Sequence, residues 1–174
     1  MLITRLSKTA MVAAVAFLTS LVAFGNITDS STNWAFVRHV FSMDTTFPDS
    51  ATHYRAITNP TVQVAGYGVI IVAETATAIL CWIGTIALLS SQRASATSFN
   101  AAKAWSIAGL TLGFLTWMVG FMAIGGEWFE MWQSTIWNGE ESAFRFHMTM
   151  IVVLVYLVLP DGVLEGRDRK SDLS

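Results

Sequence analysis

The run from residue 64 to residue 89 is apolar or small at nearly every position. At about 1.5 Å per residue, a helix over this run is long enough to cross a bilayer core of roughly 30 Å. Glu74, near the middle, is the one acidic or basic residue in the run. A bare carboxylate in hydrocarbon is costly, so Glu74 needs a partner, a proton or nearby water. The run therefore predicts a membrane helix that packs against neighbours.

Composition places the whole chain in the membrane class. Hydrophobic residues make up 53% of the 174 residues and charged residues only 13%, and the mean hydropathy is +0.54. These values depart from those of soluble domains. A net charge of −2 with few, scattered basic residues gives no field for nucleic-acid binding. Cys81 is the single cysteine, which excludes an intrachain disulfide and indicates a small buried side chain.

Four apolar runs predict an all-α membrane protein, a four-transmembrane-helix bundle that forms one domain over residues 1–174. The spans are expected at about residues 6–25, 64–89, 104–124 and 144–160. The first run has a second interpretation, because a basic start, a short apolar core and small residues near position 25 also describe a cleaved secretory leader. We favour a retained helix, since the run is long enough to span and cleavage would leave a bundle of three.

Two long outer loops, residues 26–63 and 125–143, and a solvated tail over residues 161–174 complete the predicted architecture. Asn59 and Pro60 break the chain just before the second span. The tryptophans of the second loop favour the headgroup layer of a membrane. The first loop has one apolar face at helical spacing, which predicts a short amphipathic helix along the membrane surface and is formed by Trp34, Phe36, Val37, Val40, Phe41 and Met43.

Basic residues near the ends of the spans predict the orientation. The termini and the linker at residues 90–100 would lie on the basic, cytoplasmic side of a bacterial inner membrane, and the two long loops would face outward. The basic side holds Arg5, Lys8, Arg93, Lys103, Arg167, Arg169 and Lys170, and the outer side holds only Arg38, Arg55 and Arg145.

Glu74 is the first candidate site, together with Tyr67 and Thr77 on the same helix face. A structural role is one reading, in which the acid joins two helices by a hydrogen bond. Glu74 can instead help to move protons, cations or a quinone-like ligand, or line an incidental water pocket.

An outer polar cluster is the second candidate. We expect Glu127 and Glu130 to meet Arg145 and His147, because these residues lie at the ends of consecutive spans joined by a short loop. The cluster is either a structural network or a ligand site completed by His39 and Asp44 from the first loop. The spacing matches no metal motif, and no pair of axial histidines is available for haem, so we expect no metal and no cofactor.

Small residues in the third span predict close helix packing. Gly109 and Gly113 form a GxxxG motif, and Gly120 lies two turns further on the same side.

Two long motifs resemble a bacterial family of predicted small integral membrane proteins of unknown function. The motifs are FVRHVFSMDTTF at residues 36–47 and GGEWFEMWQS at residues 125–134, with WNG at 137–139 and FR at 144–145. The resemblance covers almost the whole chain and implies a four-span inner-membrane protein. It implies no activity, ligand or catalytic residue.

Phosphate-binding, nucleophile-elbow and dinucleotide motifs are absent from the sequence, so we expect no independent enzyme. Two hypotheses remain. The first is an accessory or scaffold subunit of a larger membrane complex, such as a respiratory or redox complex, with a membrane-protein partner or a second copy. The second is a small carrier or channel component that moves protons, cations or a small ligand past Glu74. A transport pathway needs polar residues at several depths of the membrane, whereas here Glu74 and some Thr and Ser residues are the polar groups in the middle of the spans. This distribution favours the first hypothesis.

Overall fold

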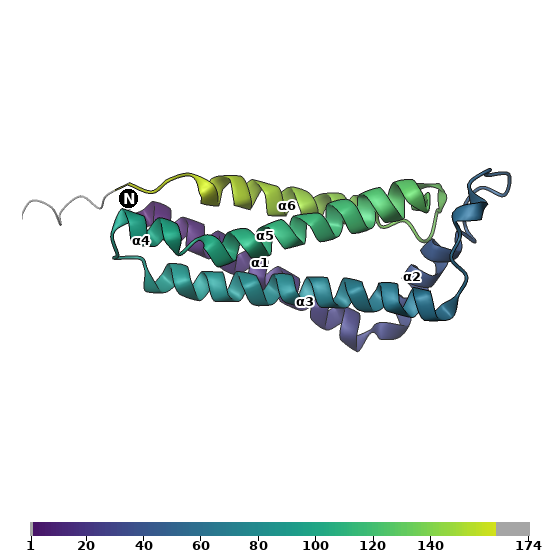
Figure 1. Cartoon of the computed structure of the whole chain (residues 1–174), viewed down its shortest axis with the longest axis horizontal. Helices are drawn as coiled ribbons and strands as arrows, with labels where there is room; N and C mark the ends of the chain where they lie inside the picture. Colours follow the sequence, from purple (N-terminus) through teal and green to yellow (C-terminus); the bar gives the residue numbers. More distant parts are fainter. Residues whose placement is uncertain (1, 163–174) are drawn as a thin grey trace, which may run out of the picture.

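The computed structural model describes residues 2–162 and forms a bundle of four long helical segments (Figure 1). Each segment is long and apolar enough to cross a membrane, which confirms the predicted four-span bundle. The first, second and fourth segments are single helices, whereas the third combines the short helix α4, the helix α5 and the π-helical segment η2. The bounds are α1 Leu2–Thr28, α3 Pro60–Ser90, α4 Ala96–Ala101, α5 Ala104–Leu115, η2 Thr116–Trp128 and α6 Glu140–Val158.

The two ends of the bundle differ in character. One end, called here the loop end, carries helix α2 (Ser30–Ser42) and the 3₁₀ turns η1 (His53–Arg55) and η3 (Met131–Gln133). The opposite end, called here the basic end, holds the start of α1, the turn between α3 and α4, and the chain after α6 (Figure 1). The connections therefore alternate between the two ends, as four antiparallel spans require.

Helix boundaries depart from the sequence prediction mainly in the linkers. Asn59 caps α3 by accepting hydrogen bonds from the backbone of Thr61 and Val62, and Pro60 takes the first helical position. The predicted break at this site is therefore present. The predicted linker at residues 90–100 contains the start of α4, which begins after the Ser95 cap. The predicted second loop is also shorter than expected, because η2 continues to Trp128 and α6 starts at Glu140.

Helix α2 forms where the first loop predicted a helix, but its apolar face packs against protein. Val37 and Val40 are buried, 4% and 7% exposed, and α2 contacts α3 and α1. The ring of Phe36 lies 6.4 Å from that of Phe121 in η2. The face expected to lie along a membrane surface therefore completes the bundle at the loop end.

Close packing between α3 and α5 depends on glycine. A Cβ atom added to Gly109 would lie 2.8 Å from the Cys81 sulfur, and one added to Gly113 would lie 3.0 Å from the Thr77 methyl carbon. These two predicted packing glycines are at a helix contact. Gly120 is not, since a Cβ there would meet nothing within 4 Å. Gly84, which lies outside the predicted GxxxG motif, packs directly against the backbone of Ser106.

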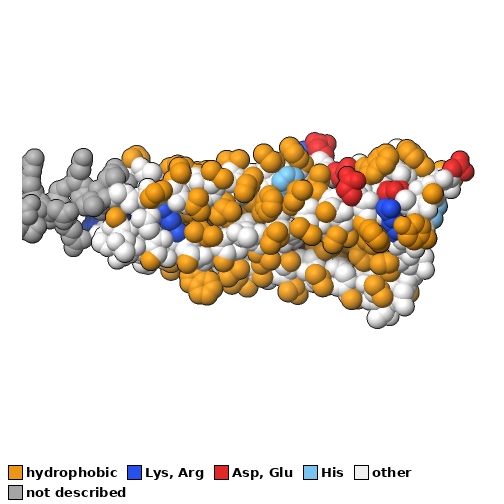
Figure 2. All heavy atoms as spheres, turned by 45° about the horizontal axis from the view of Figure 1, so that its top comes forward, with side chains coloured by type: hydrophobic (Ala, Val, Ile, Leu, Met, Phe, Trp, Pro, Cys, Tyr) orange, Lys and Arg blue, Asp and Glu red, His pale blue; other side chains and the backbone are white. Residues whose placement is uncertain are grey.

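An apolar core fills the half of the bundle toward the basic end. Its fully buried members include Val12, Cys81, Leu88, Leu110 and Leu157. Large aliphatic side chains such as Val69 and Val72 point outward and are 67% and 68% exposed. Hydrophobic side chains cover much of the face in Figure 2, as expected for a bundle surrounded by lipid.

Buried cations hold the basic end together. The ammonium groups of Lys8 and Lys103 lie 2.7 and 2.6 Å from the same carboxylate oxygen of Asp161. The guanidinium of Arg5 is fully buried and donates to the backbone oxygens of Gln92 and Ala94. Residue 161 was predicted to begin a solvated tail, but Asp161 is ion-paired here; residues 163–174 of that tail lie outside the described part of the chain.

Candidate ligand-binding cavity

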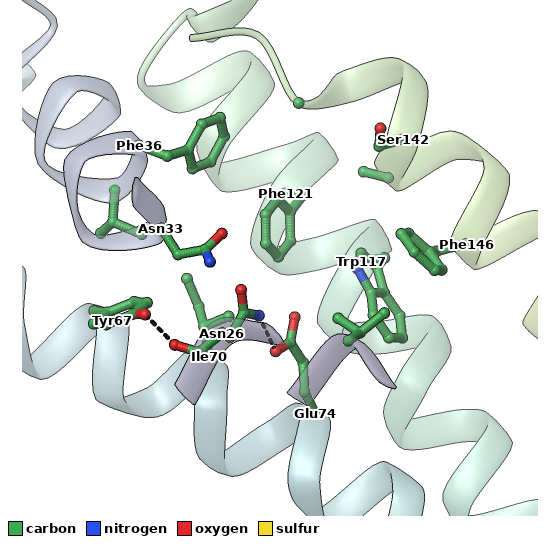
Figure 3. A pocket seen from close by; sticks show the side chains of 14 residues that line it. Asn26, Asn33, Phe36, Tyr67, Ile70, Glu74, Trp117, Phe121, Ser142 and Phe146 are labelled. Carbon is green, nitrogen blue, oxygen red and sulfur yellow. Dashed lines mark hydrogen bonds between the residues drawn. The ribbon is translucent and has the colours of Figure 1, made fainter. Parts of the chain in front are cut away.

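A cavity of about 220 Å³ lies in the loop-end half of the bundle, between α1, α2, α3, η2 and α6 (Figure 3). Glu74 and Trp117 lie nearer the apolar core, and Gly139 and Ser142 lie nearer the loop end. Ser142 is exposed, so the cavity reaches the surface there. The lining residues are Val22, Asn26, Asn33, Phe36, Val37, Tyr67, Ile70, Glu74, Trp117, Phe121, Gly139, Ser142, Ala143 and Phe146.

One wall of the cavity is polar and is organised by Asn26, near the end of α1. The side-chain amide of Asn26 donates a hydrogen bond to the carboxylate of Glu74. The hydroxyl of Tyr67 donates to the backbone oxygen of Asn26 at 2.6 Å. Glu74 is 1% exposed. Two residues of the predicted intramembrane site, Glu74 and Tyr67, thus both hydrogen bond with Asn26. The third, Thr77, donates to the backbone oxygen of Ala73 in its own helix and does not line the cavity.

Aromatic rings form the opposite wall. Trp117 stacks on Phe146 with ring centroids 4.7 Å apart, and Phe36 stacks on Phe121 at 6.4 Å. Trp117 and Phe121 both come from η2, whose π-helical turns are wider than those of an α-helix. π-helical turns occur often at functional sites in other proteins. The cavity therefore combines a large aromatic surface with a single acid.

The predicted outer cluster does not form as one group. His39 pairs with Asp44 at 2.9 Å and stacks on Trp137, with ring centroids 4.7 Å apart. Glu127 is exposed, and its backbone oxygen accepts a hydrogen bond from Arg55. The side chains thus separate into small local contacts.

Glu130 is held by the first loop and not by Arg145. Its carboxylate accepts hydrogen bonds from the hydroxyls of Thr52 and Ser50 at 2.7 and 3.0 Å, and Arg55 lies 3.8 Å away. The hydrogen bond from Thr52 is the main reason that the pKa of Glu130 is lowered. Glu130 also has a positive φ of 54°, a conformation that these contacts stabilise.

Arg145 and His147 point to different sides of α6. Arg145 forms an exposed ion pair with Glu141, one turn earlier, at 2.8 Å. His147 is buried, bonds to the backbone oxygen of Ala143 and packs edge-on against Phe114 and Phe144. Two residues two positions apart on a helix lie on different faces, which is why they cannot join one cluster. Within residues 2–162 no group of three or more His, Cys, Asp or Glu side chains is placed to hold a metal.

Sequence reasoning missed Asn26 and the aromatic wall. The matching depth of Asn26 and Glu74 shows only in the structure: the two residues lie nearly equally far along the chain from Thr9 and Gln92, which hydrogen bond to each other at 2.7 Å. Equal distances in antiparallel helices predict equal depth. The aromatic wall had no signal in the sequence either, because its residues come from three separate elements.

The sequence matches a known family along nearly its whole length. Residues 4–160 match the family described as "Predicted small integral membrane protein (DUF2165)". No curated protein and no solved structure matches the chain. With most of its residues covered by this match and four helices of spanning length, the chain belongs to the DUF2165 family of small integral membrane proteins, whose function is unknown.

Proposed function

We propose that the protein is an accessory membrane subunit, without a catalytic centre of its own, that binds one small lipophilic molecule in the loop-end cavity. The cavity itself carries this proposal: it is mostly apolar and contains a few converging polar groups. Sites for small molecules in proteins have this composition. A larger membrane complex, such as a respiratory or redox complex, or a second copy of the chain would respond to binding.

The mouth of the cavity supports access from water or from the headgroup layer. Ser142 lies beside Glu141 and Arg145 on α6. The side chains of Glu141 and Arg145 are 87% and 65% exposed. Charged side chains this exposed are costly inside hydrocarbon. This level of α6 therefore faces a polar environment, and a ligand can enter without crossing the bilayer core.

The largely apolar core toward the basic end favours binding over transport. A carrier or channel that moves protons or cations past Glu74 needs polar groups or water on both sides of it. Between Glu74 and the basic end lie buried apolar residues, including Val15, Cys81 and Leu110. A ligand in the cavity is thus separated from the far end, which is the arrangement of a binding site.

A cavity-filling variant tests the proposal. Ala143 is 1% exposed and lines the cavity, so Ala143→Leu places three extra carbon atoms in it. Ala123→Leu makes the same change on the exposed face of η2 and serves as the control. The probe is tert-butylbenzene, added to protein in nanodiscs, because apolar cavities of this kind bind small aromatic molecules.

Binding to the native state raises the melting temperature in proportion to affinity and concentration. We expect tert-butylbenzene to raise the melting temperature of the wild type and of Ala123→Leu, and to leave Ala143→Leu unchanged. Equal shifts in all three proteins would mean that the probe acts through the lipid, and would contradict the proposal.

We further propose that the basic end faces the cytoplasm of a bacterial inner membrane. Arg5, Lys8 and Lys103 lie at this end, in agreement with the positive-inside rule. Reporter fusions at Ser91 should then report the cytoplasm and fusions at Asp49 the outer side. A cytoplasmic signal at Asp49 would refute the orientation, and a purified protein that begins at Asn26 would refute the retained first span.

A further inference from the structure

We propose that the ligand of the loop-end cavity is a small lipophilic ammonium ion, held by the carboxylate of Glu74 and by the faces of the surrounding aromatic rings. The inference rests on the proposed binding function and adds the chemical class of the ligand.

The charge of the cavity wall is the first argument. Glu74 is the one acidic side chain that lines the cavity, and none of the lining residues is Lys, Arg or His. Among residues 2–162, no ion pair involves Glu74. The carboxylate is held by the neutral amide of Asn26. A ligand with a positive charge would neutralise this acid, whereas an anionic ligand would add a like charge beside it.

The hydrogen-bonding groups of the polar wall point the same way. The amide group of Asn26 already donates to Glu74, and the hydroxyl of Tyr67 already donates to Asn26. The side-chain amide of Asn33 also donates, to the backbone oxygen of Asp29. Each of these groups thus makes one hydrogen bond within the protein, each amide keeps a second N–H, and oxygen atoms of Glu74 and Asn26 have lone pairs left to accept. Such a wall suits a ligand that donates hydrogen bonds or carries a positive charge.

The aromatic wall supplies the second half of the site. Figure 3 shows the rings of Phe36, Phe121, Trp117 and Phe146 on one side of the cavity and the carboxylate of Glu74 across from them. The negative face of an aromatic ring attracts a cation, most strongly for Trp, and more so when water is excluded. The same rings give the apolar body of the ligand a surface to pack against. A compact ammonium group on a small hydrophobic body matches both walls.

Acidic residues near the mouth would concentrate cations there. Glu140 at the start of α6 lies close enough to Glu127 for the two to interact electrostatically, and Asp29 interacts in the same way with Tyr67. In Figure 2 the acidic side chains on the visible face gather in the loop-end half of the molecule. Arg145 also lies at the mouth and donates to Ser142 at 3.1 Å, but residues 26–63 and 125–145 hold seven acidic side chains and three arginines. A net negative surface raises the local concentration and the association rate of cationic ligands.

Two probes of nearly identical shape test the inference. Phenyltrimethylammonium carries a permanent positive charge, and tert-butylbenzene replaces its nitrogen with carbon and is neutral. Binding of each to the full-length protein in nanodiscs is measured by calorimetry for the wild type and for Glu74→Gln. Comparing the two proteins for one probe at a time removes the different partition of the probes into lipid.

We expect Glu74→Gln to lower the affinity for phenyltrimethylammonium by about tenfold or more and to change the affinity for tert-butylbenzene less than about twofold. An unchanged affinity for the cation would overturn the inference and leave the binding function standing. Failure of both probes to bind the wild type would overturn the inference and the binding function together.

Phe121→Leu provides a second test that does not depend on Glu74→Gln folding correctly. Leucine keeps an apolar side chain in the wall but removes the aromatic face. We expect this variant to weaken binding of the cation several-fold more than binding of tert-butylbenzene. Equal weakening of both probes would overturn the assignment of the rings as part of a cation site.

Discussion

The side-chain amide of Asn26 donates a hydrogen bond to the carboxylate of Glu74, a residue 48 positions further along the chain. This contact joins the loop-end part of α1 to the middle of α3 at the place where the two helices begin to enclose the cavity. It gives the acid of the second span its partner and fixes the carboxylate in the cavity wall.

The Asn26 to Glu74 hydrogen bond predicts a pattern of variant stabilities. Glu74→Gln keeps an oxygen that accepts from Asn26 and should fold and assemble almost normally, whereas Glu74→Leu should lose roughly 1 kcal/mol, the scale of one hydrogen bond between membrane helices. Asn26→Ala should cost a similar amount. The double variant Asn26→Ala with Glu74→Leu should be no less stable than either single variant, as measured by unfolding in detergent. Simple addition of the two losses would show that the contact is not energetically coupled.

Glycine packing gives a second prediction. A Cβ at Gly84 would lie 2.6 Å from the backbone nitrogen of Ser106, and a backbone cannot move aside as a flexible side chain can. We expect Gly84→Ala to destabilise the bundle by about 1–3 kcal/mol, the usual cost of overpacking. Gly120→Ala, where the new methyl group has open space, should melt like the wild type. Equal melting temperatures for the two variants would contradict the helix contact.

The shared carboxylate at the basic end predicts a large single-residue effect. The side chain of Asp161 is 5% exposed and forms ion pairs with both Lys8 and Lys103. Asp161→Asn would leave two buried ammonium groups without a counter-ion, at a cost of about 3–5 kcal/mol. Glu141→Gln, which removes an acid whose side chain is 87% exposed, is the control and should change little. A stable Asp161→Asn protein would mean that water reaches this end of the bundle.

Acid should destabilise the protein through two carboxylates outside the spans. Burial acts to raise the pKa of Asp161, but the hydrogen bonds and charges of Lys103 and Lys8 outweigh it, and the pKa is lowered. The pKa of Glu130 is also lowered, mainly by the hydroxyl of Thr52. A carboxyl with a lowered folded-state pKa adds stability above its unfolded pKa and loses it as the pH falls through the folded value.

The melting temperature should therefore decline below about pH 4, where free carboxyls begin to take up protons. Glu130→Gln should make this decline shallower, since it removes one of the two groups. If the melting temperature of Glu130→Gln falls with pH as steeply as that of the wild type, then Glu130 does not contribute to the loss of stability in acid.

The sequence predicted the parts of the fold that depend on local pattern. The run around Glu74, the Asn59 and Pro60 break and the apolar face of α2 each follow from the spacing or chemistry of neighbouring residues, and each is present. The partner of Arg145 was predicted wrongly, because connection by a short loop does not determine which face of α6 a residue occupies. Its partner is Glu141, one turn away, and Arg55 from the first loop lies beside Glu130.

The cavity could not be predicted, because it depends on how five elements pack. Phe36 is a residue of the first loop in the sequence, yet it lies beside Phe121 because α2 folds back against the bundle. The basic residues Arg5, Lys8 and Lys103 lie together at one end of the bundle, as their positions in the sequence predicted. That this end faces the cytoplasm stays a prediction. The burial of Lys8 and Lys103 depends on Asp161, which was predicted to begin a solvated tail, and Arg5 is held by backbone oxygens.

Locating a bound cation directly would decide whether the loop-end cavity is the working site of the protein. We suggest a crystal structure with 4-bromophenyltrimethylammonium, whose bromine gives an anomalous peak. The peak should lie inside the cavity between the ring of Trp117 and the mouth at Ser142, with the ammonium group beside Glu74, and it should be missing in Ala143→Leu. A peak only on the lipid-facing surface, or an equal peak in Ala143→Leu, would contradict the binding site described here.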